Sequence, residues 1–390
     1  MNVLVINAGS SSLKYQLLNV ETREVYAKGN CERIGIDGSF IGHEEMGGEK
    51  HRTVVELPNH KVAAEHVLDI LTDLDVPIDG IGHRVVQGGW LITESVPVTE
   101  ESIGWVREVA PLAPLHNYGE ADVIEYCLQR MPDVMGVIVP DTAFHSMIPE
   151  RAWRYALPRD VVDKLKIRKY GAHGTSHRYI WRASNEFLKG DIHKLVSCHL
   201  GSGASLCAIQ DGRDMDTTMG LTPLDGLIMG TRCGSIDPAT VCYLQREGGY
   251  TVDEVDTMMN KQSGMLALSG LSSDSRDIEQ AADDGDENCQ LALDMFFYRT
   301  SQLIAEMAQS MHGFDTMAFS AGIGENSAEM RLGVAKELEW LGVKIDEKAN
   351  EVRSDDPRVI STPDSKVKVL VVPTNEEYMI ALDVEALLSK

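Results

Sequence analysis

The sequence predicts an α/β protein built from two related halves, each containing a mixed β-sheet. An apolar run at residues 3–6 leads into the Gly/Ser-rich residues 7–12 and then into further apolar residues, and the same layout recurs at residues 195–209. Each copy is typical of a strand, a tight turn and a second strand. Strand-like and helical patterns also alternate along the chain, as they do in α/β proteins. Mixed sheets are expected because each half opens with a hairpin.

The remaining elements follow from hydrophobic periodicity. Residues 60–72 carry apolar side chains at helical spacing, which predicts an amphipathic helix. Further helices are predicted at residues 120–131, 288–312, 328–341 and 377–389. Short apolar runs predict strands at residues 51–57, 80–86, 134–139, 195–199, 316–320 and 367–372. We expect a domain boundary within residues 142–160 and a C-terminal helix that returns to the first domain, which gives domains 1–147 plus 377–390 and 148–376.

Bulk properties limit the class of protein. A chain of 390 residues is too long for one ordinary core, and roughly two to three domains are expected. A net charge of −24 argues against a general nucleic-acid binder and against binding to an anionic membrane. No apolar stretch has the length of a membrane span. Seven cysteines without a C-x-x-C pair suggest reduced thiols, and hence the cytoplasm, rather than disulfides or a zinc site.

The two Gly/Ser turns are candidate anion sites. Glycine lets the backbone approach a ligand closely, and successive N–H groups with serine hydroxyls form a concave anion site. Two such turns could hold one polyphosphate from both sides, although each could also be an ordinary surface hairpin. The P-loop motif G-x-x-x-x-G-K-[ST] is absent. Residues 322–326 join a strand to a helix but lack the third glycine of a dinucleotide fingerprint.

Charged groups and imidazoles follow several of the predicted strands. Arg84 and Asp141 end two strands of the first half, and Arg232 lies in a glycine-containing segment of the second. Either arginine alone could be a surface ion-pair partner. His173 and His177 have the i, i+4 spacing of metal ligands, but the intervening Gly and Thr argue against a helix, and we do not favour zinc.

Taken in this order, these motifs resemble the acetate kinase family, within the superfamily of sugar kinases, heat-shock chaperones and actin. The resemblance extends from Met1 to the C-terminal helix. It implies two similar domains of the ribonuclease H-like, actin-like ATPase fold, each with a mixed five-stranded sheet, and a nucleotide in the cleft. It also implies reversible, Mg²⁺-dependent transfer of the ATP γ-phosphoryl to a short-chain carboxylate, which yields an acyl phosphate and ADP. A cytoplasmic homodimer acting in acetyl-CoA biosynthesis is the further implication.

The resemblance also assigns roles to residues of this sequence. It implies that Mg²⁺, or alternatively Mn²⁺, binds Asn7 and Glu376. It implies catalytic roles for Arg84, His116, Asp141, His173 and Arg232. ATP or ADP would contact Ser10, Ser12, Lys14, His199, Leu200, Gly201, Ser202, Gly203, Asp274, Ser275, Arg276, Gly322, Ile323, Gly324, Glu325 and Asn326. The carboxylate would contact Arg84, with its acyl group against Val86, Leu115, Ala172 and Pro223.

Several positions depart from the family pattern. Ala172 stands where the family usually has an aromatic residue, which leaves room for extra methylenes, each worth up to about 0.8 kcal/mol when buried. A propionate or longer-chain carboxylate kinase is therefore an alternative to an acetate kinase. Ser202 replaces a usual Asn, Gln87 a usual His, and Tyr118 a usual Pro. A pyrophosphate-dependent kinase and a non-catalytic or chaperone-like ATPase are further alternatives.

Overall fold

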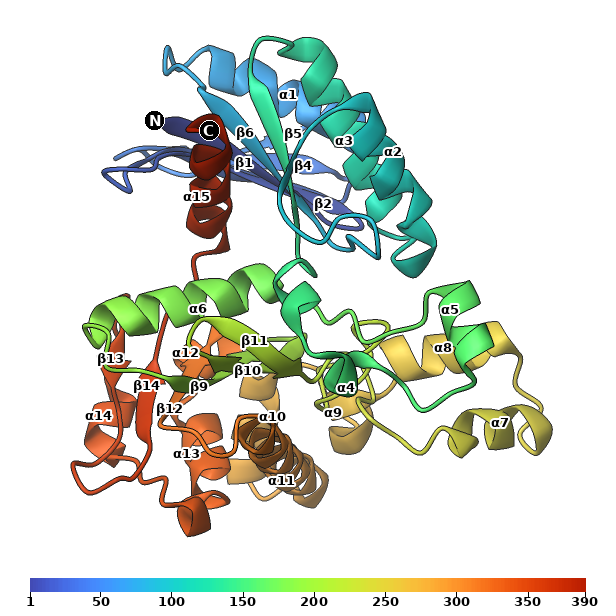
Figure 1. The fold of residues 1–390 in the computed structure, drawn as a ribbon, viewed down its shortest axis with the longest axis vertical. Coiled ribbons are helices and arrows are strands. Elements are labelled where there is room, and N and C mark those ends of the chain that lie inside the picture. Colours follow the sequence, from blue (N-terminus) through green and yellow to red (C-terminus); the bar gives the residue numbers. More distant parts are fainter. The chain divides into compact units, whose positions relative to one another are not determined.

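The computed structural model describes all 390 residues, which form two compact units (Figure 1). Unit 1 contains Met1–Ser146 and Asn375–Lys390, and unit 2 contains Met147–Thr374. The first boundary differs by one residue from the expected one, and the second by two. The second difference has a local cause: Asn375 caps the C-terminal helix by accepting a hydrogen bond from the N–H of Tyr378 at 2.9 Å, so the cap belongs with the helix in unit 1.

Unit 1 is built on an eight-stranded mixed sheet in the order β5-β4-β3-β2-β1-β6-β8-β7. The strands β1 and β2 form the predicted antiparallel hairpin, whereas β1, β6 and β8 run parallel. The strands span Asn2–Ala8 (β1), Ser12–Asn19 (β2), Val25–Glu32 (β3), Phe40–Glu45 (β4), His51–Val54 (β5), Gly80–Val85 (β6), Val96–Pro97 (β7) and Met135–Pro140 (β8).

Helices cover both faces of this sheet. Ile81 packs into a core that contains residues of α1 and α3, on one face. Gly80 and Gly82 point to the other face, where a Cβ atom would collide with Val384 and Ile380 of α15. Glycine at these two strand positions therefore lets α15 pack closely on β6. The helices span His60–Thr72 (α1), Glu100–Glu108 (α2), Asn117–Arg130 (α3) and Glu376–Leu388 (α15).

Unit 2 repeats the same strand plan. Its six-stranded mixed sheet has the order β11-β10-β9-β12-β14-β13, and its first five strands match β3-β2-β1-β6-β8 in both order and direction. The strands span Lys194–Leu200 (β9), Ala204–Gln210 (β10), Arg213–Thr217 (β11), Thr316–Ser320 (β12), Arg358–Val359 (β13) and Lys368–Val371 (β14). The expectation of five strands per sheet holds for this shared part but is too low for the whole sheets, because β4, β5, β7 and β13 are added at the edges.

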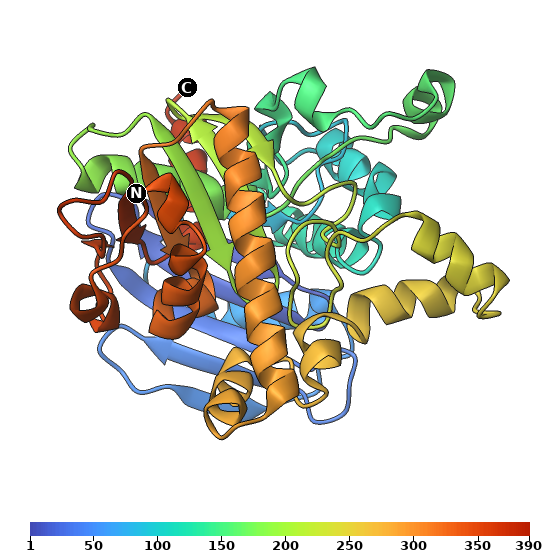
Figure 2. The same cartoon turned by 90° about the horizontal axis from the view of Figure 1, so that it is seen from below.

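The long helix α11 lies along one face of the second sheet (Figure 2), and α6 contacts β9 and β12. Apolar side chains of α11 pack with those of β9 and β12 in the core of this unit. The helices span Glu150–Trp153 (α4), Arg159–Leu165 (α5), Gly174–Phe187 (α6), Ala239–Arg246 (α7), Val252–Lys261 (α8), Gly264–Ser269 (α9), Ser275–Asp283 (α10), Glu287–Ser310 (α11), Ala321–Asn326 (α12), Ala328–Lys336 (α13) and Glu347–Glu351 (α14).

One sequence-based argument is wrong at α6. Gly174 and Thr175 were expected to prevent a helix, but they form its first turn. The first turn tolerates poor helix formers because its N–H groups have no intrahelical partners, and the following residues bury one face of the helix.

None of the helices combines the length and apolar character needed to cross a membrane.

Candidate active site

In unit 1, polar side chains gather where β1, β6 and β8 end. We call Asn7, Arg84, Glu120, Asp141 and Glu376 the carboxylate cluster. Asn7 of β1 and Arg84 of β6 are direct partners in the parallel register. Arg84 donates from Nη1 to Asn7 Oδ1 at 3.2 Å and from Nη2 to Asp141 Oδ2 at 3.0 Å. Asp141 is buried, and 16% of the Arg84 side chain is exposed. The guanidinium is thus held from two sides at the strand ends.

The electrostatic balance of the carboxylate cluster is negative. Burial lowers the pKa of Arg84, whereas the negative charges of Asp141, Glu376 and Glu120 raise it. Together the three carboxyl groups outweigh burial, so the net shift is upward and the guanidinium stays charged. Burial and the nearby Asp141 raise the pKa of Glu376 to about 7, against the opposing effects of Arg84 and Lys14. Three carboxyl groups therefore share one guanidinium, and added positive charge would favour their ionised forms.

This donor set fits the expected magnesium ion. Asn7 and Glu376 offer an amide oxygen and a carboxylate, and Mg²⁺ prefers oxygen ligands. The raised pKa of Glu376 shows that its anionic form lacks sufficient compensation from the protein alone. A divalent cation would supply that compensation.

Glu120 is the functional candidate that the sequence reasoning missed. Only 2% of this residue is exposed, and its Oε1 and Oε2 atoms accept from the Val86 N–H at 3.2 and 3.1 Å. Burial raises its pKa to about 8, although Arg84 and the Val86 N–H oppose the shift. A signal for it was present: Glu120 lies on the buried face of α3 with Ala121 and Ile124, where a carboxyl group is unusual.

The other predicted residues of unit 1 lie on the β1–β2 turn and around the start of α3. Ser10 and Ser12 belong to the turn, which the Gly9 N–H closes with a hydrogen bond to the Ser12 carbonyl at 2.8 Å. Lys14 pairs with Asn7 across the hairpin and is exposed. His116 immediately precedes α3. The remaining predicted residues of unit 1 are Val86, which is partly buried, and Leu115, which is 67% exposed.

In unit 2, three imidazoles gather beside the β9–β10 turn. We call His173, His177 and His199 the histidine cluster. The rings of His173 and His199 are stacked, with centroids 4.1 Å apart. His173 has a φ of 58°, in the left-handed region that non-glycine residues rarely adopt. Such backbone strain is typical of functional sites, where the surrounding structure holds it.

Arg232 lies beside the same turn. A Cβ atom built on Gly203 would be 3.4 Å from Arg232 Nη1 and 3.7 Å from His173 Nε2. Both side chains therefore border residues 199–203, the second predicted phosphate loop. Arg232 donates from Nη1 to the Pro223 carbonyl at 3.0 Å, and burial lowers its pKa. A guanidinium nevertheless remains charged at neutral pH.

Unit 2 also contains a pocket of about 540 Å³. It is lined by eight predicted nucleotide contacts, namely Gly201, Ser202, Asp274, Ser275, Arg276, Gly322, Ile323 and Asn326. The same pocket is lined by residues that were not predicted, namely Ser273, Glu279, Ser327 and Arg353. Two separate segments of the chain, at the starts of α10 and α12, thus face one cavity with the second phosphate loop.

The remaining predicted residues of unit 2 do not line this pocket. Leu200 is fully buried, and Gly324 packs on Phe319. Glu325 turns back and accepts from the Ala321 and Thr374 N–H groups at 2.8 and 3.0 Å. The other four are His199, in the histidine cluster, Gly203, beside Arg232, Pro223, whose carbonyl accepts from Arg232, and Ala172, which is 4% exposed and packs in the hydrophobic core.

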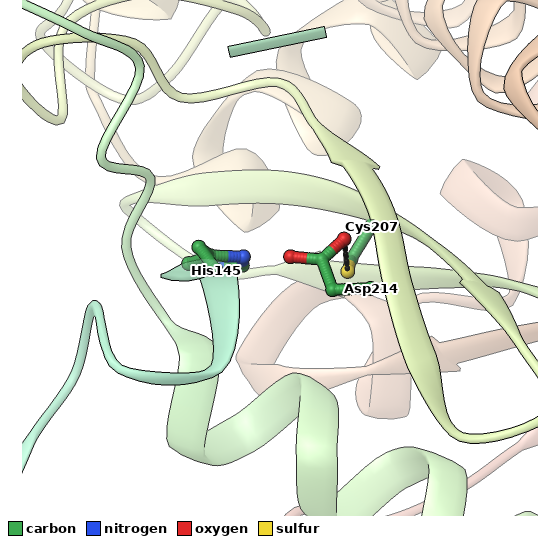
Figure 3. A group of neighbouring side chains, drawn as sticks. All are labelled: His145, Cys207 and Asp214. Carbon is green, nitrogen blue, oxygen red and sulfur yellow. Dashed lines mark hydrogen bonds between the residues drawn. The ribbon is translucent and has the colours of Figure 1, made fainter. Parts of the chain in front are cut away.

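Figure 3 shows a further buried polar pair, Cys207 of β10 and Asp214 of β11. Cys207 Sγ donates to Asp214 Oδ1 at 3.2 Å. Burial, with the nearby aspartate, raises the pKa of the thiol well above its usual range. The thiolate is the reactive and metal-binding form of cysteine, and the raised pKa disfavours that form. We therefore assign this pair a packing role.

The repeated sheet with glycine-rich turns, and the cations beside those turns, are features of a phosphotransferase. The chain belongs to the acetokinase family, whose model matches residues 2–382. Members of this family are phosphotransferases with a carboxyl group as acceptor. The chain is 48% identical to an acetate kinase of Thermotoga maritima, with 100% of this chain and 99% of the relative covered.

Two solved structures have closely similar folds. An acetate kinase of Porphyromonas gingivalis superposes with a TM-score of 0.93 at 41% identity, covering 99% of each chain. A propionate kinase of Francisella tularensis gives a TM-score of 0.93 at 37% identity, again covering 99% of each chain. The α/β fold with two mixed sheets is therefore that of the acetate and propionate kinases, as the sequence predicted.

Proposed function

We propose that this protein transfers the γ-phosphoryl group of ATP reversibly to acetate, which gives acetyl phosphate and ADP. Membership of the acetokinase family supports the reaction class. The observation that carries the proposal is Arg84, whose guanidinium is fixed by Asn7 and Asp141 at the strand ends of unit 1. Arginine binds carboxylates in a planar, two-pronged geometry, so Arg84 suits the acceptor substrate.

Acetate needs no general base. A carboxylate with a pKa near 4–5 is already ionised at neutral pH, as the side chains of Asp and Glu are. The chemical problem is instead to bring this anion to a negatively charged phosphoryl group in the right orientation. Arg84 of unit 1 would hold the carboxylate. The candidate contacts for the methyl group are Val86 and Leu115 in unit 1 and Ala172 and Pro223 in unit 2.

Unit 2 would stabilise the transferred phosphoryl group. Arg232 and His173 border residues 199–203, so both could donate hydrogen bonds to phosphoryl oxygens at that loop. Each such donor is typically worth roughly 10²–10³ in rate. In unit 1, Ser10 of the β1–β2 turn and Ser12 and Lys14 of β2 are the candidate phosphate contacts, and His116 is a candidate donor.

Asn7 and Glu376 would hold Mg²⁺, and the same oxygen ligands suit Mn²⁺. When bound, the ion would neutralise phosphate charge.

Asp141 is assigned to positioning rather than to acid–base chemistry, because its Oδ2 accepts from Arg84 Nη2 at 3.0 Å. Near-normal turnover of Asp141→Asn would exclude both roles.

The pocket of unit 2 would bind the adenosine part of ATP. Its volume of about 540 Å³ suits a ligand of this size. Gly322 and Ile323 would form one wall, while Asp274, Ser275 and Arg276 would supply polar contacts from the other. A pyrophosphate-dependent enzyme would have no use for such a pocket, which favours ATP.

A propionate kinase is the second candidate. The small side chain of Ala172 favours it, because a larger residue at this position would reduce the space for the acyl group. The similarity to a propionate kinase of Francisella tularensis is compatible with it. The burial of Ala172 in the core of unit 2 weakens this candidate, since most of the side chain is already covered.

We further propose a cytoplasmic homodimer that functions in acetyl-CoA biosynthesis. Seven cysteines without disulfides suit a reducing compartment. Exposed apolar residues on α7 and α8, such as Tyr243 and Val252, suit an interface between copies of the chain.

The test is formation of acyl phosphate. Purified protein with Mg-ATP would be given acetate, propionate or butyrate separately, and the acyl phosphate would be trapped with hydroxylamine. The highest kcat/KM with acetate is expected. The highest value with propionate or butyrate would replace acetate by the second candidate, and no product from any acid would overturn the proposal.

A further inference from the structure

A continuous chain of hydrogen bonds leads from His173 into the core of unit 2. His173 Nδ1 bonds to Ser205 Oγ, Ser205 Oγ to His177 Nε2, and His177 Nδ1 to Ser197 Oγ, each at 2.8 Å. Ser205, His177 and Ser197 are all fully buried. We call these four residues the serine–histidine relay. His173 borders the phosphate loop at Gly203, whereas the other three are fully buried.

The number of protons restricts this relay to two ordered patterns. A neutral imidazole carries one N–H, and a serine hydroxyl carries one O–H. The side chain of Ser205 bonds only to the two imidazoles, so its proton must point to one of them. In one pattern, each group of the relay donates to the next in the direction from Ser197 to His173. In the other pattern, each group donates in the direction from His173 to Ser197.

Ser197 decides between the two patterns. Its hydroxyl has His177 Nδ1 as its single side-chain partner, and it is fully buried. If His177 donated to Ser197, the Ser197 proton would be left without an acceptor in the core, which is costly. If Ser197 donates to His177, then His177 Nε2–H donates to Ser205, and Ser205 donates to His173 Nδ1. Every proton between Ser197 and His173 Nδ1 is then paired, and the His173 proton is on Nε2.

A neighbouring imidazole limits the charge that His173 and His199 can carry together. Its ring is stacked on that of His199, with an interplanar angle of 21°. Two imidazolium ions in this arrangement would repel each other, which disfavours charge on both rings. The Nε2 atom of His173 is the one that faces Gly203 and, with Arg232, borders the loop. The relay thus determines whether this atom is a donor or an acceptor.

We propose that Ser197, His177 and Ser205 are positioning residues that hold the proton of His173 on Nε2, facing residues 199–203. The effect of this proton on catalysis rests on the proposed function, because a phosphoryl oxygen can accept a hydrogen bond from His173 only if Nε2 carries the proton. The proton assignment itself stands on the hydrogen bonds alone. A buried histidine that merely fills the core would have no such directional effect.

The first test reads the tautomer directly. With ¹⁵N-labelled histidine, the ring nitrogen shifts of His173 are assigned by comparison with His173→Gln. In the unmodified protein, we expect the Nε2–H tautomer. In Ser205→Ala and in Ser197→Ala, we expect the Nδ1–H form to become populated. An Nδ1–H tautomer in the unmodified protein, or no change in either variant, would overturn the inference.

The second test distinguishes an effect of hydrogen-bond direction at His177 from an effect of side-chain packing. Glutamine places an amide near the Nε2 position of histidine and asparagine near Nδ1, so His177→Gln can still donate to Ser205 whereas His177→Asn cannot. We expect kcat to fall on the order of 10- to 100-fold in Ser205→Ala and His177→Asn, with both KM values changed by less than about twofold. His177→Gln should retain most of the activity. Equal losses in the two His177 variants would contradict the directional role.

The matched control is Ser184→Ala. Ser184 is a buried serine on α6 whose hydroxyl has no hydrogen-bond partner. Its removal should leave kcat and the His173 tautomer unchanged. If the unmodified protein forms no acyl phosphate, the proposed function fails, but the NMR measurement still decides the proton position.

Discussion

Arg84 and Arg232 are two guanidinium groups in opposite surroundings. Arg84 is paired with Asp141, and its pKa is raised by three carboxyl groups despite burial. Arg232 donates to the Pro223 carbonyl and the Met229 sulfur, and burial lowers its pKa. Arg84 is therefore held in a fixed orientation, whereas Arg232 offers a charge that no protein carboxylate neutralises. The first arrangement suits recognition of a carboxylate, and the second suits attraction of phosphate.

The first prediction concerns Arg84→Gln. This substitution removes both hydrogen bonds and the charge, so kcat/KM for acetate should fall by roughly 10²–10³. The KM for ATP should change little, because the proposed nucleotide pocket lies in unit 2. Steady-state kinetics with each substrate varied in turn will measure this. Arg107→Gln, which breaks exposed ion pairs with Asp122 and Glu125, is the control. An equal loss in both variants would contradict the role of Arg84.

The second prediction concerns pH and Glu120. Its pKa rises from 4.5 in the unfolded chain to about 8 in the folded protein. The folded state therefore binds this proton more tightly, and stability is lost as the pH rises from about 5 to about 8. The slope is at most about 1.4 kcal/mol per pH unit for this group.

Glu120→Gln stays neutral at every pH and keeps a side chain that can accept from the Val86 N–H. The melting temperature of the unmodified protein should therefore fall more steeply between pH 5.5 and 8 than that of Glu120→Gln. Glu376, with its pKa of about 7, contributes with the same sign in both proteins. Parallel pH profiles would show that Glu120 is ionised throughout this range.

At the level of elements, the hairpins and the strands that follow them were predictable. The repeated Gly/Ser turns identified β1–β2 and β9–β10, because the turn residues and flanking apolar runs are local signals. The strands β7 and β13 were not predicted, because two residues each provide no clear hydrophobic pattern. The strand β5 was predicted within residues 51–57, although all four of its residues are exposed.

For the site too, residues with a local sequence signal could be predicted, whereas residues whose role depends on buried contacts could not. Arg84, Asp141 and Glu376 could be placed because each lies near the end of a predicted strand or shortly after it. The roles of Glu120 and Ser197 could not, since they depend on which buried partners the fold supplies. A carboxyl group on the apolar face of α3 was visible in the sequence, but its contact with the Val86 N–H was not.

The third prediction concerns α12, whose end is held by the buried Arg331. This side chain donates to the Gly324 and Glu325 carbonyls and to Asn350, and burial lowers its pKa to about 10. Arg331→Met should destabilise the fold by on the order of 2–4 kcal/mol, because it leaves buried acceptors unpaired.

The same variant should raise the KM for ATP several-fold while the KM for acetate stays within about twofold, since residues of α12 line the proposed nucleotide pocket. Urea unfolding and steady-state kinetics will test both effects. Arg299→Met is the control, because Arg299 is only partly buried and its hydrogen bond to Gln302 is exposed. A higher KM for acetate alone would contradict the assignment of α12.

At the level of the whole molecule, one strand plan serves two kinds of site. Both sheets share the order and directions of five strands, and each places a glycine-rich turn after its first strand. The units differ in what surrounds that turn. Unit 1 adds carboxyl groups around an arginine, and unit 2 adds imidazoles and a pocket. A duplicated scaffold with different polar groups suits an enzyme with two dissimilar substrates.

The fourth prediction follows from this division. In hydrogen exchange, Mg-ADP alone should slow amide exchange in unit 2, at residues 273–279 and 322–327, because the pocket is formed there. Acetate alone should give no protection at those segments. Mass spectrometry of peptides from each unit will show where protection occurs. Protection by Mg-ADP that is confined to unit 1 would contradict the assignment of the pocket.

The central claim is that the acetate carboxylate attacks the γ-phosphorus of ATP. The most direct measurement uses acetate labelled with ¹⁸O in both carboxyl oxygens, with Mg-ATP and purified protein. Attack by the carboxylate leaves both labels in the acetyl phosphate, one of them bridging to phosphorus, which mass spectrometry and the ³¹P isotope shift will detect. We expect this doubly labelled product. Acetyl phosphate that retains a single label, or the absence of any acetyl phosphate, would contradict the account.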